Sequence, residues 1–106
     1  MFFELRQYRT LPGKRAEWVT YMEEVIIPFQ VSKGMVVVGS FVGQEEDDLY
    51  VWIRRFASEE ERVALYSAVY ESDFWKDDVA PKVGALLDRS RSVITRIEAT
   101  PKSVIQ

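Results

Sequence analysis

The sequence predicts an α+β fold in which strands and helices follow the order β-α-β-β-α-β. Four short segments are rich in β-branched and aromatic residues, and the segments after the first and third carry apolar residues at three- and four-residue steps. Strands in this order form one antiparallel sheet with the helices on one face, which is the ferredoxin-like plan. A chain of 106 residues without an evident linker forms one domain, 1–106, with 100–106 as a tail.

The first half of the chain predicts a strand over 2–10 and a long helix over 14–31. In the strand, FFELRQYRT, Arg6 and Tyr8 share one face because side chains alternate. Leu-Pro-Gly at 11–13 ends this strand. Pro28 should kink the helix or end it early. The apolar face of the helix consists of Trp18, Met22, Val25, Ile26 and Phe29.

Two further strands are expected over 34–43 and 49–56, joined by the acidic loop QEEDD at 44–48. The first of them is apolar on both faces, which is typical of a strand covered on both sides. The second carries adjacent arginines, Arg54 and Arg55, which must point to opposite faces of the sheet. An arginine that leaves water needs a partner or a ligand.

The rest of the chain predicts a broken helical region and a last strand. Ser58 with Glu61 matches a capping box at the start of a helix. The buried face of this helix is expected to be Val63, Tyr66, Val69 and Tyr70. An interruption at 72–73 and a short turn over 74–78 follow. Pro81 suits the first turn of a helix that ends near residue 89, and the last strand is expected over 92–99.

The apolar strands also predict a homodimer. A sheet with helices on one face would leave a large apolar patch in water on the other, which monomers rarely do. Two sheets facing each other across a two-fold axis would cover it. The alternative is a monomer whose tail covers this face.

Composition excludes several kinds of chemistry. The chain has no histidine and no cysteine, so thiolate chemistry, disulfides and the usual histidine bases are impossible. We expect no metal site and no cofactor; the QEEDD loop is interpreted as a hydrated hairpin tip. A net charge of −3 without a basic tract argues against nucleic acid. No apolar run is long enough for a membrane span and no signal peptide is visible, so we expect a cytoplasmic protein.

The chain resembles the NIPSNAP family, in its short single-domain bacterial form. The start ELRQYR followed by LPGK is similar to the opening of that family, and Phe56, Ser58 and Arg62 are similar to its entry into the second helical region. Asp73 and Trp75 are similar to an Asp-Pro-x-Trp turn, although Phe74 replaces its proline. The late stretch from 80 to 104 also runs in register.

The resemblance implies a dimeric α/β barrel of ferredoxin-like subunits, which agrees with the expected dimer. Many relatives have histidine and tryptophan two residues apart in the third strand, where this chain has Trp52 and Arg54. Animal members of the family are linked to vesicular traffic and mitochondrial quality control. Barrels of this architecture also include cofactor-free monooxygenases, haem-degrading enzymes and isomerases, an analogy at the level of the fold.

The residues themselves suggest a half-polar aromatic cleft between sheet and helices. Guanidinium groups pair with carboxylates and aromatic rings stack, so the cleft suits a small planar or anionic ligand. Tyr21 could help to close it. The alternative is that Arg6 and Arg54 pair with Glu4 and Glu98 and that the tryptophans are core. The candidate ligand-binding residues are Arg6, Tyr8, Trp18, Trp52, Arg54, Trp75 and Arg96.

Three functions remain open at this stage. The first is a dimeric ligand-binding or interaction module. The second is a cofactor-free enzyme, monooxygenase- or isomerase-like, in which Tyr8 or an arginine activates an oxygen-bearing substrate. The third is a structural dimer that recognises another protein.

Overall fold

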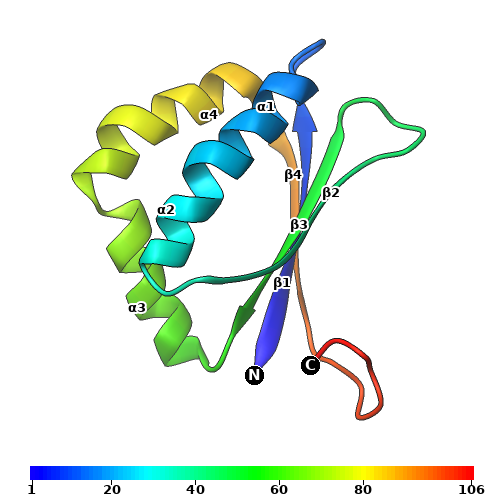
Figure 1. Cartoon of the computed structure of the whole chain (residues 1–106), viewed down its shortest axis with the longest axis vertical. Coiled ribbons are helices and arrows are strands. Elements are labelled where there is room, and N and C mark those ends of the chain that lie inside the picture. Colours follow the sequence, from blue (N-terminus) through cyan, green and yellow to red (C-terminus); the bar gives the residue numbers. More distant parts are fainter.

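A computed structural model describes residues 1–106 and shows one four-stranded antiparallel sheet with helices on one side (Figure 1). The strand order is β2-β3-β1-β4, so the α+β, ferredoxin-like plan expected from the sequence is confirmed. The strands are β1 (Phe2–Thr10), β2 (Val36–Val42), β3 (Leu49–Phe56) and β4 (Leu87–Ile97). The helical segments are α1 (Arg15–Tyr21), η1 (Met22–Ile26), α2 (Ile27–Ser32), α3 (Glu59–Tyr70), η2 (Trp75–Val79) and α4 (Ala80–Leu86).

The central strand β1 pairs with β3 on one side and β4 on the other. Glu4 lies opposite Arg54 and Arg6 lies opposite Trp52. Directly opposed residues of antiparallel strands point to the same face. The register therefore brings the even-numbered polar and aromatic side chains of both strands together under the helices.

The first helical region runs from Arg15 to Ser32 without a break, although Pro28 was expected to kink or end it. Pro28 lies just after the π-helical segment η1, at the second position of α2. A proline lacks an N–H group and its ring clashes with the carbonyl four residues earlier. The residue four positions before Pro28 lies in η1, whose turns are wider than those of an α-helix. We infer that this wider turn removes the clash and lets the helix continue.

The second helical region starts as predicted and then departs from the prediction. Ser58 caps α3, because its hydroxyl accepts a hydrogen bond from the Glu61 N–H at 3.1 Å. The expected turn over 74–78 is wrong: Phe74 is helical and the following residues, 75–79, form η2. The last helix, α4, ends at Leu86, earlier than predicted. Strand β4 therefore begins at Leu87, five residues before the expected start of the last strand at 92.

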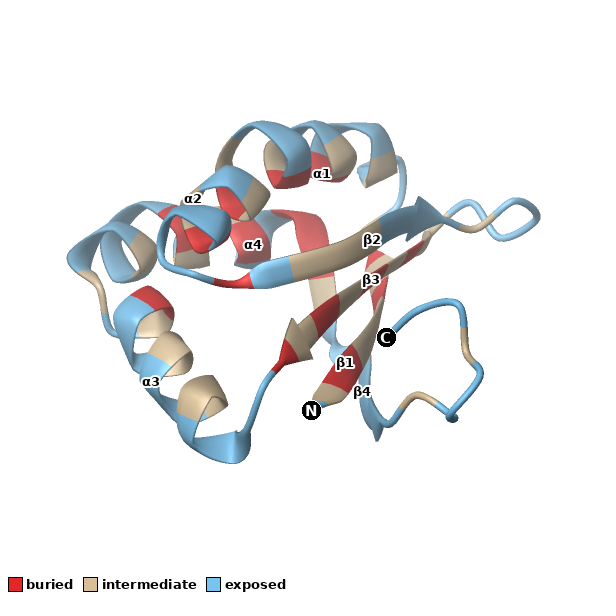
Figure 2. Ribbon diagram, turned by 60° about the horizontal axis from the view of Figure 1, so that its bottom comes forward, coloured by how far each residue is buried: buried red, intermediate tan, exposed pale blue.

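The core lies between the helices and one face of the sheet (Figure 2). Its larger cluster contains Tyr8, Trp18, Met22, Ile26, Tyr50, Trp52, Val79, Val83, Leu86 and Leu87. Val63 was predicted to be part of the buried face of α3, but it is 54% exposed. No helix is long and apolar enough to cross a membrane.

The opposite face of the sheet remains largely uncovered by the chain itself. The C-terminal segment lies on that side, and Arg55 donates a hydrogen bond to the Gln106 backbone carbonyl (Figure 2). Strand β2 was expected to be covered on both sides, yet most of its residues are exposed or half-exposed. Apolar side chains that remain exposed on the open face are Val36, Phe41, Val93 and Ile97.

Candidate functional site

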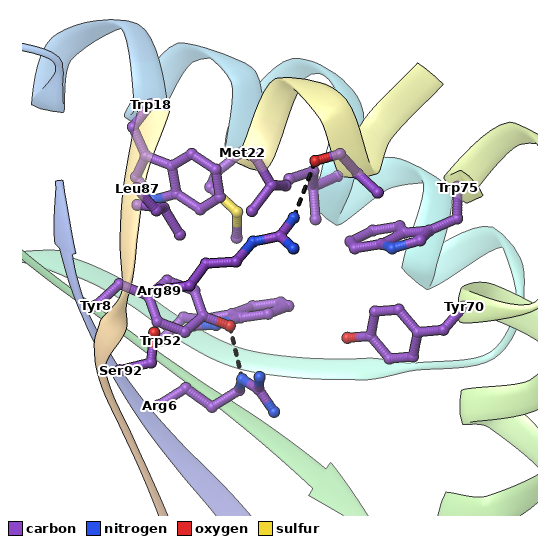
Figure 3. A pocket seen from close by; sticks show the side chains of 13 residues that line it. Arg6, Tyr8, Trp18, Met22, Trp52, Tyr70, Trp75, Leu87, Arg89 and Ser92 are labelled. Atoms are coloured by element: carbon purple, nitrogen blue, oxygen red, sulfur yellow. Dashed lines mark hydrogen bonds between the residues drawn. The ribbon is translucent and has the colours of Figure 1, made fainter. Parts of the chain in front are cut away.

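A cavity of about 320 Å³ lies between the sheet and the helical layer (Figure 3). This volume is at the lower end of the range for small-molecule sites. Ten of the thirteen residues around it are hydrophobic. The lining residues are Arg6, Tyr8, Trp18, Met22, Ile26, Trp52, Tyr70, Trp75, Ala80, Val83, Leu87, Arg89 and Ser92.

Four of the sequence regions that were expected to form a cleft contribute to this cavity. Strands β1 and β3 supply Arg6, Tyr8 and Trp52 from the sheet, and the helical layer supplies Trp18 and Trp75. These five are candidate site residues from the sequence. They are held by aromatic packing: the Tyr8 and Trp18 rings meet edge to face with centroids 6.0 Å apart.

Two predicted site residues do not line the cavity. Arg54 is fully buried behind its wall. Arg96 lies near the C-terminal end of β4, because the strand register places it opposite Glu4. There it pairs with Glu59 and its guanidinium lies over the Phe2 ring. Tyr21, expected to help close the cleft, also lies outside the lining.

Arg54 is enclosed by polar partners and aromatic rings. Its Nη2 donates to Glu4 Oε1 at 2.8 Å and to the Tyr66 hydroxyl at 2.9 Å, and its Nη1 donates to the Gln30 Oε1 and the Tyr70 hydroxyl at 2.7 and 2.8 Å. The guanidinium carbon is also 4.7 Å from the Trp52 ring centroid. Of the pairings expected as the alternative, Arg54 with Glu4 is therefore present.

Glu4 is shared by two arginines. Its carboxylate is 2.8 Å from Arg54 Nη2 and 3.5 Å from Arg6 Nη1, and it accepts hydrogen bonds from the Tyr66 hydroxyl. Burial alone would raise the pKa of Glu4, but the Tyr66 hydrogen bond and the charge of Arg54 outweigh it and hold the pKa below its ordinary value. Glu4 is thus an ionised carboxylate between two cations, and this group of three side chains has a net charge of +1.

Arg6 connects this charged group to the cavity. Its Nε donates to the Tyr8 hydroxyl at 2.6 Å (Figure 3). Its Nη1 donates to the Tyr66 hydroxyl at 3.2 Å. Since the Tyr8 oxygen accepts from Arg6, its own proton is available to an acceptor in the cavity. Glu98, the other expected partner of these arginines, is exposed and forms no ion pair.

Arg89 is a cavity residue that sequence reasoning missed. It lies near the start of β4, in a stretch that the sequence analysis assigned to the end of a helix. The direction of its side chain could therefore not be predicted. Its side chain extends across the cavity toward the helical layer, and Nη2 donates to the Ala80 backbone carbonyl at 2.9 Å (Figure 3). No carboxylate lies within ion-pair distance of Arg89.

Tyr70 and Ser92 were also not among the candidate site residues. Tyr70 shared the predicted inner face of its helix with Tyr66, a signal that pointed to burial and not to a cavity. Two buried donors in the wall, the indole N–H groups of Trp18 and Trp52, have no hydrogen-bond partner in the protein. The lining contains no carboxylate, and the chain has no cluster of three potential metal ligands.

Fold and site together define a ferredoxin-like α+β domain with a donor-rich aromatic cavity. The family model of NIPSNAP proteins matches residues 3–101, so this chain belongs to the NIPSNAP family, as its sequence motifs indicated. No curated protein matches the chain.

Solved structures share this fold at low sequence identity. A NIPSNAP family protein with unknown function from Agrobacterium tumefaciens is 22% identical with a TM-score of 0.89, over 100% of this chain and 94% of that chain. An uncharacterized NIPSNAP domain protein from Burkholderia xenovorans is 16% identical with a TM-score of 0.82, over 97% and 98%. An antibiotic biosynthesis monooxygenase is 14% identical with a TM-score of 0.68, over 95% and 100%. At these identities the likeness is one of fold.

Proposed function

We propose that this protein is a dimeric binding module that holds a small planar or anionic ligand in the cavity between sheet and helices. The observation that carries the proposal is the composition of the cavity wall. It combines all three tryptophans of the chain with two arginines and has no acidic side chain. Rings that stack and donors that fix orientation are the usual components of a small-molecule site.

Titration with two planar probes of the same shape, 2-naphthoate and its neutral amide 2-naphthamide, tests the proposal. All three tryptophans line the cavity, so their indole N–H cross-peaks in a ¹H–¹⁵N NMR spectrum report on its contents. Binding of at least one probe should shift these peaks in a saturable way. No shift with either probe at millimolar concentration would refute the binding function.

A cavity-filling variant separates binding in the cavity from binding elsewhere. Ser92→Phe adds a ring at a lining position of β4, and aromatic residues are well tolerated in strands. This variant should lose probe binding. Ser90→Phe is the matched control, because Ser90 is an exposed residue of the same strand outside the lining.

A cofactor-free enzyme, monooxygenase- or isomerase-like, is the second candidate function. The specific observation is the 2.6 Å hydrogen bond from Arg6 to the Tyr8 hydroxyl at the cavity wall, which leaves the phenol proton for a substrate oxygen. If a bound molecule is turned over, Tyr8→Phe should lower the rate strongly while the dissociation constants of the probes change little. Binding without turnover favours the first function.

The homodimer belongs to the same proposal. We infer that two open sheet faces pack against each other, since Val36, Phe41, Val93 and Ile97 remain exposed there despite the C-terminal segment. Helices already cover the other face of the sheet (Figure 2). The cytoplasmic location expected from the sequence stays a prediction.

A further inference from the structure

We infer that the ligand is a flat aromatic molecule with one anionic oxygen group, and that Arg6 and Arg89 hold this group from two sides of the cavity. This inference rests on the proposed binding function and names its ligand class. A neutral planar molecule would satisfy the proposed function without satisfying this inference.

The first argument is an imbalance of charge. Arg6 and Arg54 share a single carboxylate, that of Glu4, and the shorter contact belongs to Arg54. Arg89 is paired with a neutral backbone carbonyl. The whole chain is net negative, yet every charged side chain in the cavity lining is an arginine. Arg6 is mostly buried, and positive charge held away from water is costly unless an anion compensates it. Arg89 is exposed and adds positive charge beside the cavity.

The second argument is the supply of unused donors. Arg6 uses Nε and Nη1 in hydrogen bonds to Tyr8 and Tyr66, while Nη2 makes none. The Arg6 side chain is mostly buried, with 16% of its surface exposed. Buried donors in proteins are nearly always satisfied, so an acceptor in this cavity would complete the hydrogen bonding of Arg6 Nη2. Carboxylate or phenolate oxygens accept from several donors at once.

The third argument is the position of Arg89. Its guanidinium is tethered by one bond to Ala80, at the junction of η2 and α4, and its side chain is otherwise exposed (Figure 3). Exchange of the neutral carbonyl for an anionic oxygen would give a stronger, charge-assisted hydrogen bond. Arg89 would then close over the ligand while Arg6 contacts it from the sheet.

The experiment compares dissociation constants of 2-naphthoate and 2-naphthamide for the wild type and three variants, using the indole N–H peaks. Arg89→Gln removes the charge and shortens the side chain, so the hydrogen bond to the Ala80 carbonyl is lost as well. In that variant naphthoate should bind about 10- to 100-fold more weakly, as expected for loss of a charged hydrogen bond, while naphthamide binding is unchanged. Arg6→Gln should show the same selectivity.

Arg91→Gln is the control for net charge. Arg91 is an exposed arginine of the same strand that pairs with Asp48 outside the cavity, and its replacement should leave both dissociation constants unchanged. Equal binding of both probes in wild type and Arg89→Gln would overturn the anion inference and leave the proposed binding function intact. Failure of both probes to bind would overturn the proposed function and this inference with it.

Discussion

Arg54 shows how a single charged residue can organise a core. The side chain is fully buried, yet four oxygen atoms accept its hydrogen bonds and aromatic rings surround its guanidinium group. Glu4 supplies the only carboxylate in contact with it. A buried ion pair of this kind adds little net stability by itself, but removal of one partner leaves an uncompensated charge.

The ionisation of Glu4 therefore links stability to pH. The pKa of Glu4 in the folded protein is below its ordinary value of 4.5, because the Tyr66 hydrogen bond and the Arg54 charge outweigh the effect of burial. In the unfolded chain Glu4 takes up a proton at higher pH than in the folded protein. Its contribution is therefore fully present above about pH 4.5 and is lost as the pH falls through the folded pKa.

Glu4→Gln should destabilise the protein by about 3 to 5 kcal/mol at pH 7, because the buried Arg54 loses its counter-charge. The free energies of unfolding in urea should converge as the pH falls below 4.5, since wild-type Glu4 becomes neutral as well. A difference that stays constant down to acid pH would contradict this account. Glu59→Gln is the control at an exposed ion pair and should leave the unfolding midpoint close to that of the wild type.

At the scale of elements, two prolines stand in equivalent positions. Pro28 and Pro81 each occupy the second position of an α-helix that directly follows a π-helical segment. The sequence reveals both prolines: Pro28 predicts a helix end or kink, and Pro81 predicts the first turn of a helix, which is where it lies. Whether a helix stops or widens by one residue depends on tertiary packing, which local patterns do not encode. Both segments contribute cavity residues, namely Met22 and Ile26 from η1 and Trp75 from η2.

The same limit applies to the candidate site. Strand alternation placed Arg6 and Tyr8 on the face that the helices cover, and the structure has them there. Alternation could not show that Arg54 is sealed behind the wall, because that depends on Gln30 and Tyr70 from two different helices. Arg89 was missed because the boundary between α4 and β4 was predicted several residues too late.

The capping of α3 offers a test at this scale. The Ser58 hydroxyl accepts from the Glu61 N–H, and the Glu61 carboxylate accepts from the Ala57 N–H at 3.1 Å. Ser58→Ala should lower the free energy of unfolding by about 1 kcal/mol, whereas Ser58→Gly should cost only a few tenths, because glycine is itself tolerated as a cap. Urea unfolding of both variants measures this. Equal losses would show that the hydroxyl is not the source of the effect.

At the scale of the whole molecule, the two faces of the sheet differ in what covers them. The inner face carries the helices and the cavity, and the outer face carries Val36, Phe41, Val93 and Ile97 with 38 to 54% of each side chain exposed. The C-terminal segment reaches this side through the bond between Arg55 and Gln106, but Val104 on it is fully exposed. A tail bound in this way does not bury the open face.

A carboxylate on the outer face should therefore break the proposed dimer. In a two-fold interface Val93→Asp introduces the charge twice, so both copies must lose water from a carboxylate without gaining a partner. Sedimentation velocity at micromolar concentration should show a dimer for the wild type and a monomer for Val93→Asp. Val63→Asp is the matched control, because Val63 on α3 is equally exposed, at 54% against 51%, but lies on the helical layer. It should remain dimeric.

A monomeric wild type, or a Val93→Asp variant that stays dimeric, would contradict pairing through the sheets. Probe titration of a monomeric Val93→Asp variant would then show whether the cavity, which is built from one chain, binds without its partner.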